Sequence, residues 1–250
     1  MSAGHAVGTL AVTLLFCLVF LRASDLKILG RMGHRMAVSL AGGAAVAYVF
    51  MDLSPELQEA ASRFREATSF FSIKILDYGI HAATMLGFVV FYGLEVLVIR
   101  SHDEADRQRR READHAHSLF RIHMVAFAAY AWIVSYLLVR SLEETALSLS
   151  FYAAAMIMHF LCLAHSLREE HGALYDRIGA WLLAASCVAG WGCGMAFVLP
   201  EPAIGVLLGV VAGGIMVNTM ILEIPREKEG RFVPFLLGAA GYSGLLLLAR

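Results

Sequence analysis

Charged residues are scarce in this sequence, and their two signs nearly cancel. Asp, Glu, Lys and Arg make up 16% of the 250 residues, and the formal net charge is -1. A chain without a positive excess does not attract polyanions, so nucleic acid is not expected as a ligand. Apolar residues make up 59% of the chain, whereas a soluble domain averages about 45–50%.

Motifs of covalent chemistry are also missing. The four cysteines lie inside apolar runs without zinc-finger spacing, so they predict neither a disulfide framework nor a zinc finger. The sequence offers no nucleophile with a partnered base, no phosphate-binding loop and no soluble catalytic domain. We therefore expect no enzyme and no organic cofactor. The first apolar run follows an uncharged tail, which favours a retained helix over a signal peptide.

Long apolar runs dominate the sequence. A membrane-spanning helix needs about 20 mostly apolar residues, and such runs predict one all-α transmembrane domain of eight helices. The predicted spans are 7–21, 36–53, 75–99, 119–139, 147–167, 179–199, 203–224 and 232–249. The polar segment 100–118 is predicted as a cytoplasmic loop, and the outer loop 55–74 as a short amphipathic helix on the membrane surface.

The basic residues predict the orientation of these spans. With both termini outside, the cytoplasmic segments hold 15 of the 20 Lys and Arg residues. Cytoplasmic loops carry the excess of Lys and Arg in membrane proteins. The sequence therefore predicts a multi-pass protein of the cell membrane with both termini outside, and the lipid bilayer as its first partner.

Two segments are related in sequence. They are 41–56, AGGAAVAYVFMDLSPE, and 212–227, AGGIMVNTMILEIPRE. Aligned on their Ala-Gly-Gly triplets, Asp52 lies opposite Glu223, while Pro55 and Pro225 are one position out of step. The predicted topology gives the two helices opposite directions. This predicts an inverted repeat that relates helices one to three to helices six to eight, a construction found in many secondary transporters.

Ionisable side chains inside spans are costly, and each is therefore a candidate functional residue. The predicted spans contain Asp52, His81, Glu95, His123, His159, His165, Asn218 and Glu223, and Cys162 lies one turn from His159. His123 and His159 fall on consecutive antiparallel helices at similar depth, and imidazole suits first-row divalent ions. The sequence favours a metal site that contains both, with hydrogen bonds between helices as the alternative for each. In the loop, His115 and His117 are either a loose metal site or part of a solvated helical linker.

The ends of two predicted helices resemble motifs of the ZIP family of divalent-metal transporters. The segment 51–56, MDLSPE, resembles the His-Leu-Leu-Pro-Glu type motif of its second helix. The segment 222–227, LEIPRE, resembles the Glu-x-x-Pro-Glu type motif of its seventh. The resemblance implies eight spans with both termini outside, an inverted repeat, and a divalent cation such as zinc or iron as the substrate. It also implies a transport path that includes Asp52, His123, His159 and Glu223.

The fourth and fifth helices depart from the family pattern. The family usually carries His-Asn/Ser-x-x-Asp-Gly and His-Glu-x-Pro-His-Glu there, whereas segments 123–128 and 159–164 keep only the first histidine. A paired-metal site needs several anionic oxygens to offset two dications in a low dielectric. At most one metal site is therefore expected, built from His123 and His159 with Glu223, Glu95 or Asn218 as further ligands.

The sequence is also compatible with three alternatives to transport. The missing acids favour a non-transporting ZIP-like scaffold or metal sensor. Two of the histidines at positions 81, 123 and 159 could instead be axial ligands of a haem. A membrane enzyme that uses Asp52, His81 and His159 is a weaker alternative. Small residues along several helices permit a homodimer, but contacts within the chain explain them equally well.

Overall fold

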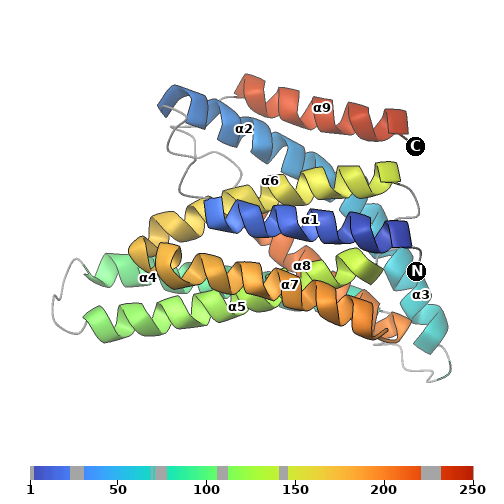
Figure 1. Ribbon diagram of the computed structural model, residues 1–250, viewed down its shortest axis with the longest axis horizontal. Helices are drawn as coiled ribbons and strands as arrows, with labels where there is room; N and C mark the ends of the chain where they lie inside the picture. The colour runs from blue at the N-terminus through green and yellow to red at the C-terminus, as the bar shows by residue number, and fades with distance from the viewer. Residues whose placement is uncertain are drawn as a thin grey trace.

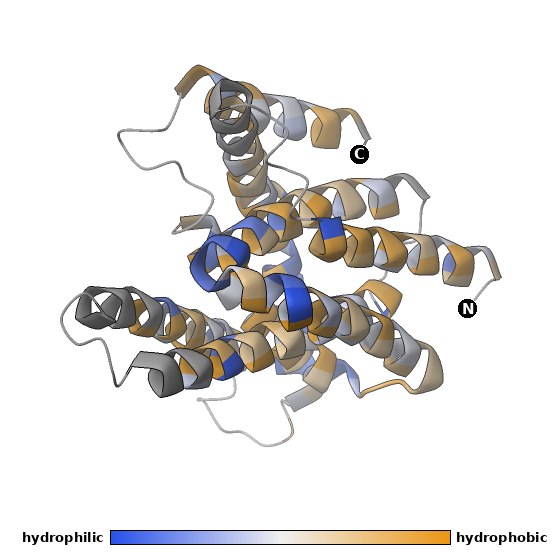
Figure 2. Cartoon of the chain, turned by 60° about the vertical axis from the view of Figure 1, so that its left-hand side comes forward, coloured by the Kyte–Doolittle hydropathy of each residue, from blue (hydrophilic) through white to orange (hydrophobic). Residues whose placement is uncertain are grey.

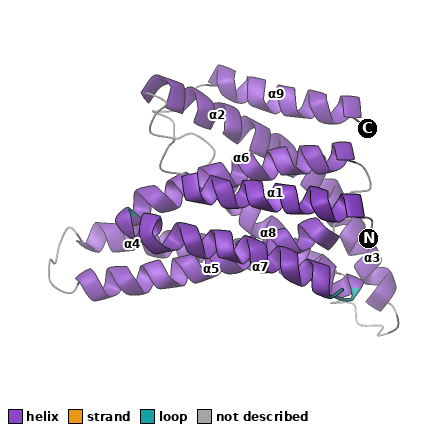
Figure 3. Cartoon of the chain, viewed as in Figure 1, coloured by secondary structure: helices purple, strands orange, loops and turns teal. Residues whose placement is uncertain are grey.

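The computed structural model describes residues 3–22, 31–68, 70, 78–105, 112–140, 146–220 and 232–249. These residues are almost entirely helical, apart from a short loop at 197–200 (Figure 3). The helices are α1 (Ala3–Arg22), α2 (Arg31–Tyr48), α3 (Ser54–Thr68), α4 (Gly79–Ala105), α5 (Glu112–Arg140), α6 (Ala146–His171), α7 (Ala180–Ala196), α8 (Glu201–Asn218) and α9 (Phe232–Ala249). Two π-helical turns, Val49–Leu53 and Tyr175–Gly179, precede α3 and α7.

Six of the described helices are long and apolar enough to cross a membrane. They contain the segments Ala3–Arg22, Gly79–Leu97, Ser118–Arg140, Leu149–His171, Tyr175–Ala196 and Glu201–Asn218. Predicted spans two and eight correspond to α2 and α9, of which α9 holds a shorter apolar helix. Apolar residues run along most helices (Figure 2), and large exposed ones such as Leu18, Val89 and Leu237 suit contact with lipid. The protein is therefore all-helical and of the multi-pass membrane type.

The two termini lie at the same end of the bundle, which we call the terminal end (Figure 1). The opposite, distal end carries the start of α5 and the turn between α6 and α7. The most extensive helix contacts are those of α4 with α8, α2 with α9, and α5 with α7, while α1 packs on α6 and α7. Helices distant in sequence therefore form the closest pairs.

Glycine allows the backbones of α2 and α9 to touch. A side chain at Gly43 would overlap the carbonyl oxygen of Phe235 and crowd the amide nitrogen of Ala239. A side chain at Gly238 would overlap the carbonyl oxygen of Leu40. Small residues at such positions let membrane helices approach closely and pack along their backbones.

The pair of α4 and α8 is built in the same way. A side chain at Gly213 would overlap the carbonyl oxygen of Thr84 and the amide nitrogen of Phe88. A side chain at Gly87 would overlap the carbonyl oxygen of Val210. We call the two contacts, through Gly43 with Gly238 and through Gly213 with Gly87, the glycine seams.

The second predicted span, 36–53, does not end as a helix at residue 53, because the chain stays helical through Pro55. The Val49–Leu53 turn connects α2 to α3, and the Ser54 amide donates to the Val49 carbonyl five residues back. A proline has no N–H to donate, and its ring clashes with the preceding turn of a regular helix. The wider π-turn accommodates Pro55, so the chain stays helical past Asp52 and into α3.

The amphipathic helix expected in 55–74 is present as α3. Its apolar side packs against other helices of the protein as well as facing the membrane. Its residues Leu57, Ala60, Ala61 and Phe64 are buried, and α3 contacts α8 and α4. The ring of Phe64 lies against Gly79 at the start of α4. The helix therefore closes the terminal end of the α4–α8 pair.

Candidate functional site

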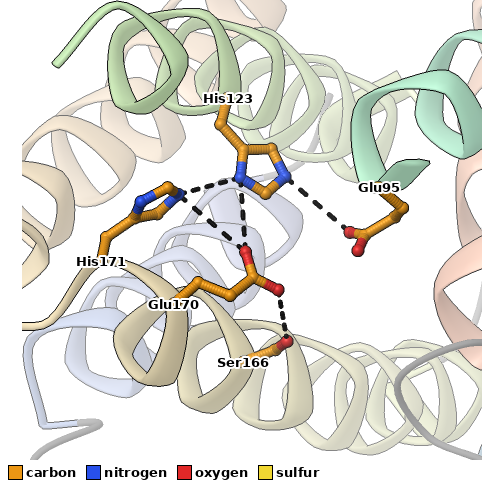
Figure 4. Close-up of polar contacts among 5 residues, drawn as sticks. All are labelled: Glu95, His123, Ser166, Glu170 and His171. Carbon is orange, nitrogen blue, oxygen red and sulfur yellow. Dashed lines mark hydrogen bonds and ion pairs between the residues drawn. The ribbon is translucent and has the colours of Figure 1, made fainter. Parts of the chain in front are cut away.

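His123 is the centre of a polar cluster inside the distal half of the bundle (Figure 4). Its side chain is 1% exposed. On one side of the ring, Nδ1 lies 2.9 Å from Nε2 of His171 and 3.5 Å from Oε2 of Glu170. On the other side, Nε2 lies 3.8 Å from Oε1 of Glu95. The imidazole of α5 therefore stands between residues of α6 and a carboxylate of α4.

The turn between α6 and α7 presents Glu170 and His171. His171 is the last residue of α6, and Gly172 follows with φ 53°, a left-handed conformation that glycine adopts without strain. The Gly172 amide caps the helix by donating to the Arg168 carbonyl at 2.8 Å. The Arg168 guanidinium donates to both Asp176 oxygens, at 2.7 and 3.1 Å, and so clasps the turn.

Neighbouring side chains orient the two ligands on this turn. The Ser166 hydroxyl, one turn before Glu170, donates to Glu170 Oε1 at 3.2 Å. The other oxygen, Oε2, has no hydrogen-bond partner within the described segments and lies 3.9 Å from His171 Nε2. The rings of Phe120 and His171 meet edge to face, with centroids 5.2 Å apart. One carboxylate oxygen is therefore left facing two imidazoles.

The arrangement matches the ligand set of a divalent transition metal. The ligand atoms of His123, Glu170 and His171 all lie within 4.8 Å of one another. Ligands about 2.1 Å from a tetrahedral zinc ion are about 3.4 Å apart, and the three separations of 2.9, 3.5 and 3.9 Å bracket that value. Two imidazoles and one carboxylate suit first-row divalent ions and leave a fourth position open.

His159, which the sequence pairs with His123, has a different partner. Its Nε2 lies 2.8 Å from the hydroxyl of Tyr130, and both residues are buried. Tyr130 follows His123 by seven residues on α5, which is about 10 Å along the helix axis. Phe127 lies between the two levels and contacts the rings of both His123 and Tyr130. The structure thus brings His123 together with Glu170 and His171, and His159 with Tyr130.

The remaining predicted residues are spread along the bundle. Glu95 and Asn218 are buried in the distal half, whereas His81 is exposed near the start of α4. Asp52 is half-buried in the π-turn before α3, and Cys162 is half-buried on α6. His165 lies 3.4 Å from Glu169 and is outside the cluster around His123. Glu223 lies outside the described residues, as do the side chains of His115 and His117 on the first turns of α5.

Glu170 and His171 were not among the residues selected from the sequence. They belong to the polar stretch SLREEHG, which follows the apolar run of α6 and looks like a helix leaving the membrane. A usable signal was present, because Gly172 directly after a Glu-His pair marks a helix end that folds back on itself. Because the turn that leads to the next apolar helix is short, it places such a Glu-His pair beside the neighbouring helices.

Within the described residues, the cluster of His123, Glu170 and His171 is the one group of three acidic, histidine or cysteine side chains close enough to share a metal ion. It joins the middle of the chain, α5, to the end of α6. Comparisons of the whole chain found no matching family model, no matching curated protein and no matching solved structure.

Proposed function

We propose that the protein transports a divalent transition-metal cation, of the zinc or iron class, across the membrane. The observation that carries the proposal is the convergence of His123, Glu170 and His171 inside a bundle of apolar helices. His123 and His171 are neutral ligands, and Glu170 supplies the negative charge that offsets part of the dication. Ionisable groups placed at such cost inside a membrane protein mark substrate and ion pathways.

The incomplete coordination favours a transported ion over a structural one. Structural zinc sites have four protein ligands and are closed, whereas this group offers three ligand atoms among the described residues. The ligands also belong to candidate spans, Ser118–Arg140 and Leu149–His171, close to the distal end. An ion held by three ligands beside one end of a membrane bundle can be released from that end.

We further propose that the fold is an eight-span inverted repeat of the ZIP type. The support is the correspondence of the two glycine seams. Gly43 and Gly213 are 170 positions apart, and so are Leu40 and Val210 on the same two helices, which face Gly238 and Gly87 across the seams. This register differs by one from the register of the Ala-Gly-Gly triplets, and it places Pro55 opposite Pro225.

The helices that pack on α8 and α2, which are α4 and α9, also correspond to each other in register. Gly87 on α4 and Gly238 on α9 are 151 positions apart, and Thr84 and Phe235, which face Gly213 and Gly43, are separated by the same number. The two pairs run in opposite directions along the bundle (Figure 1). Eight crossings agree with termini at one end, and the basic loops then make the distal end cytoplasmic.

A layer of aromatic rings separates the cluster from the terminal end. Phe91 lies 5.3 Å from both Phe127 and Tyr130, and Tyr130 lies 6.2 Å from Phe160, between ring centroids. A transporter that works by alternating access is closed on one side of its ion at any moment. A sensor that holds its ion permanently would also be closed here, so this layer keeps the metal sensor as the second candidate.

Uptake of zinc into proteoliposomes separates the two functions. We expect wild-type protein to carry Zn²⁺, and His171→Ala or Glu170→Gln to reduce the flux at least about tenfold, because each removes one of three ligands. His165→Ala is the matched control, since it removes a histidine of the same helix from outside the cluster. Zn²⁺ binding without flux, from folded and inserted protein, would replace the transporter with the sensor.

A further inference from the structure

A second group of polar atoms lies on the opposite side of the His123 ring from Glu170 and His171. His123 Nε2 has no hydrogen-bond partner among the residues that the structure describes, and Glu95 Oε1 lies 3.8 Å from it. Both side chains are at most 4% exposed. A buried carboxylate in a membrane bundle is costly unless a partner offsets its charge.

Asn218 is a further buried group without partners among the described residues. It is the single asparagine of the chain, it is fully buried, and neither Oδ1 nor Nδ2 makes a hydrogen bond within the described part of the structure. Nearly all buried polar side chains in proteins are hydrogen-bonded, so an amide with both atoms unpaired calls for an explanation such as a ligand.

The helix register brings Asn218 to the level of Glu95 and His123. A side chain on Gly214 would meet the rings of Phe91 and Tyr130 at 2.9 and 3.2 Å. Asn218 lies one turn beyond Gly214 on the same face of α8. Helix α4 runs parallel to α8, because Gly209 faces Ile80 and Gly213 faces Thr84 and Phe88.

One helical turn toward the distal end along α4 and along α5 leads from the aromatic rings to Glu95 and His123. Glu95 lies one turn beyond Phe91 on α4. His123 lies one turn before Phe127 on α5, which runs the opposite way (Figure 1), and its ring centroid is 4.9 Å from that of Phe127. Asn218, Glu95 and His123 therefore occupy one layer, directly distal to the aromatic rings.

We propose that Glu95, Asn218 and Nε2 of His123 form a second position for the transported cation, deeper in the bundle than the first. The inference rests on the proposed function. One carboxylate oxygen, one amide oxygen and one imidazole nitrogen are all ligands of first-row divalent ions. The separation of 3.8 Å between Glu95 Oε1 and His123 Nε2 is within the span of two ligands bound to one ion at about 2.1 Å.

The two positions share one imidazole and are occupied in turn. A neutral imidazole has one nitrogen with a free lone pair, while the other nitrogen carries the proton. A cation on Nδ1 requires the proton on Nε2, beside Glu95, and a cation on Nε2 requires the proton on Nδ1, beside Glu170. The two occupied states therefore hold the same number of protons on the ring and differ in which nitrogen carries the proton. The cation thus moves from the distal turn into the bundle around a single ring.

Binding of Co²⁺, which reports its ligands through its visible absorption, tests the second position in the full-length protein in detergent. The double variant Glu170→Gln/His171→Ala keeps only Glu95, Asn218 and His123. We expect it to bind one Co²⁺ about 10- to 100-fold more weakly than wild type, with a spectrum of fewer nitrogen ligands. Adding Asn218→Leu should abolish this residual binding, whereas adding Thr219→Val, which removes the neighbouring buried hydroxyl, should preserve it.

The outcomes separate the two proposals. If the double variant is folded but binds no Co²⁺, or if Asn218→Leu leaves its residual binding unchanged, the second position is refuted and the first stands. Equal losses from Asn218→Leu and Thr219→Val would mean local repacking and would also refute it. A wild-type protein that binds no Co²⁺ refutes the proposed function and this inference together.

Discussion

His123 and His171 are 48 residues apart in the chain, and their Nδ1 and Nε2 atoms are 2.9 Å apart. At this distance one ring donates a hydrogen bond and the other accepts it. A cation bound by both nitrogens has to replace the proton between them. Protons and the cation therefore compete for the same atoms.

Cation affinity is expected to fall as the pH falls. Only the neutral imidazole has a lone pair for the metal, so protonation of His123 or His171 removes a ligand and adds a repelling charge. The Co²⁺ affinity of the wild-type protein should therefore drop as the pH is lowered, measured by titration in detergent. His165→Ala should show the same pH profile. A pH-independent affinity would contradict binding through the two imidazoles.

The clasp on the α6–α7 turn is expected to support the site from outside. Arg168→Gln breaks the ion pair with Asp176 that fixes the turn carrying Glu170 and His171. Because this pair is partly exposed, its loss should cost at most about 1 kcal/mol of stability, while Co²⁺ affinity falls about two- to fivefold. Arg177→Gln removes the same charge from an exposed position nearby. Equal effects of the two variants would show that charge matters and the clasp does not.

The hydrogen bond between Tyr130 and His159 is expected to serve packing. Tyr130→Phe removes the hydroxyl that lies 2.8 Å from His159 Nε2, which should lower stability by about 1 kcal/mol. Co²⁺ affinity should stay within about twofold of wild type, since Tyr130 lies about two helical turns from His123. Thermal unfolding and Co²⁺ titration measure the two effects. A loss of affinity as large as that of His171→Ala would assign His159 to the metal site.

The glycine seams are expected to hold the bundle together. Gly43→Val and Gly213→Val place a branched side chain against the backbone of the facing helix, and each should cost about 3 kcal/mol or more. Gly241→Val is the matched control, because a side chain there meets no atom of the described residues within 4 Å. It should change stability by about 1 kcal/mol or less. Thermal unfolding in detergent compares the three, and similar losses in all of them would contradict the seams.

Much of the fold follows from local sequence properties. Runs of about 20 apolar residues predict helices because a membrane or a core accepts the same composition along the whole run. The continuation of the helix past Pro55 could not be predicted from the sequence, because the π-turn depends on one displaced hydrogen bond, from the Ser54 amide to the Val49 carbonyl. The burial of α3 depends on its contact with α8. The hydrophobic periodicity of 55–74 predicts an apolar side but does not show that a helix from the other half of the chain covers it.

The candidate site was predictable in part. His123 stands out because an ionisable residue in an apolar run is rare, and the same reasoning found Glu95 and Asn218. Glu170 and His171 have polar neighbours, so their sequence alone resembles a solvated helix end. What brings them to His123 is the turn at Gly172, which directs them toward a helix that begins 60 residues earlier. The Glu-His-Gly sequence marks the turn itself, but which helix the turn meets depends on tertiary geometry and is not visible in the sequence.

Because of the glycine seams, the protein has fewer independently moving units than it has helices. Interlocked backbones cannot slide past one another, so α2 moves with α9, and α4 moves with α8, each pair as a double rod. The rod of α2 and α9 packs on the remainder chiefly through α6, the helix that ends in Glu170 and His171. A tilt of that rod would pull on the helix that carries two of the three proposed ligands. Opening of the bundle and loosening of the cation would then be one motion.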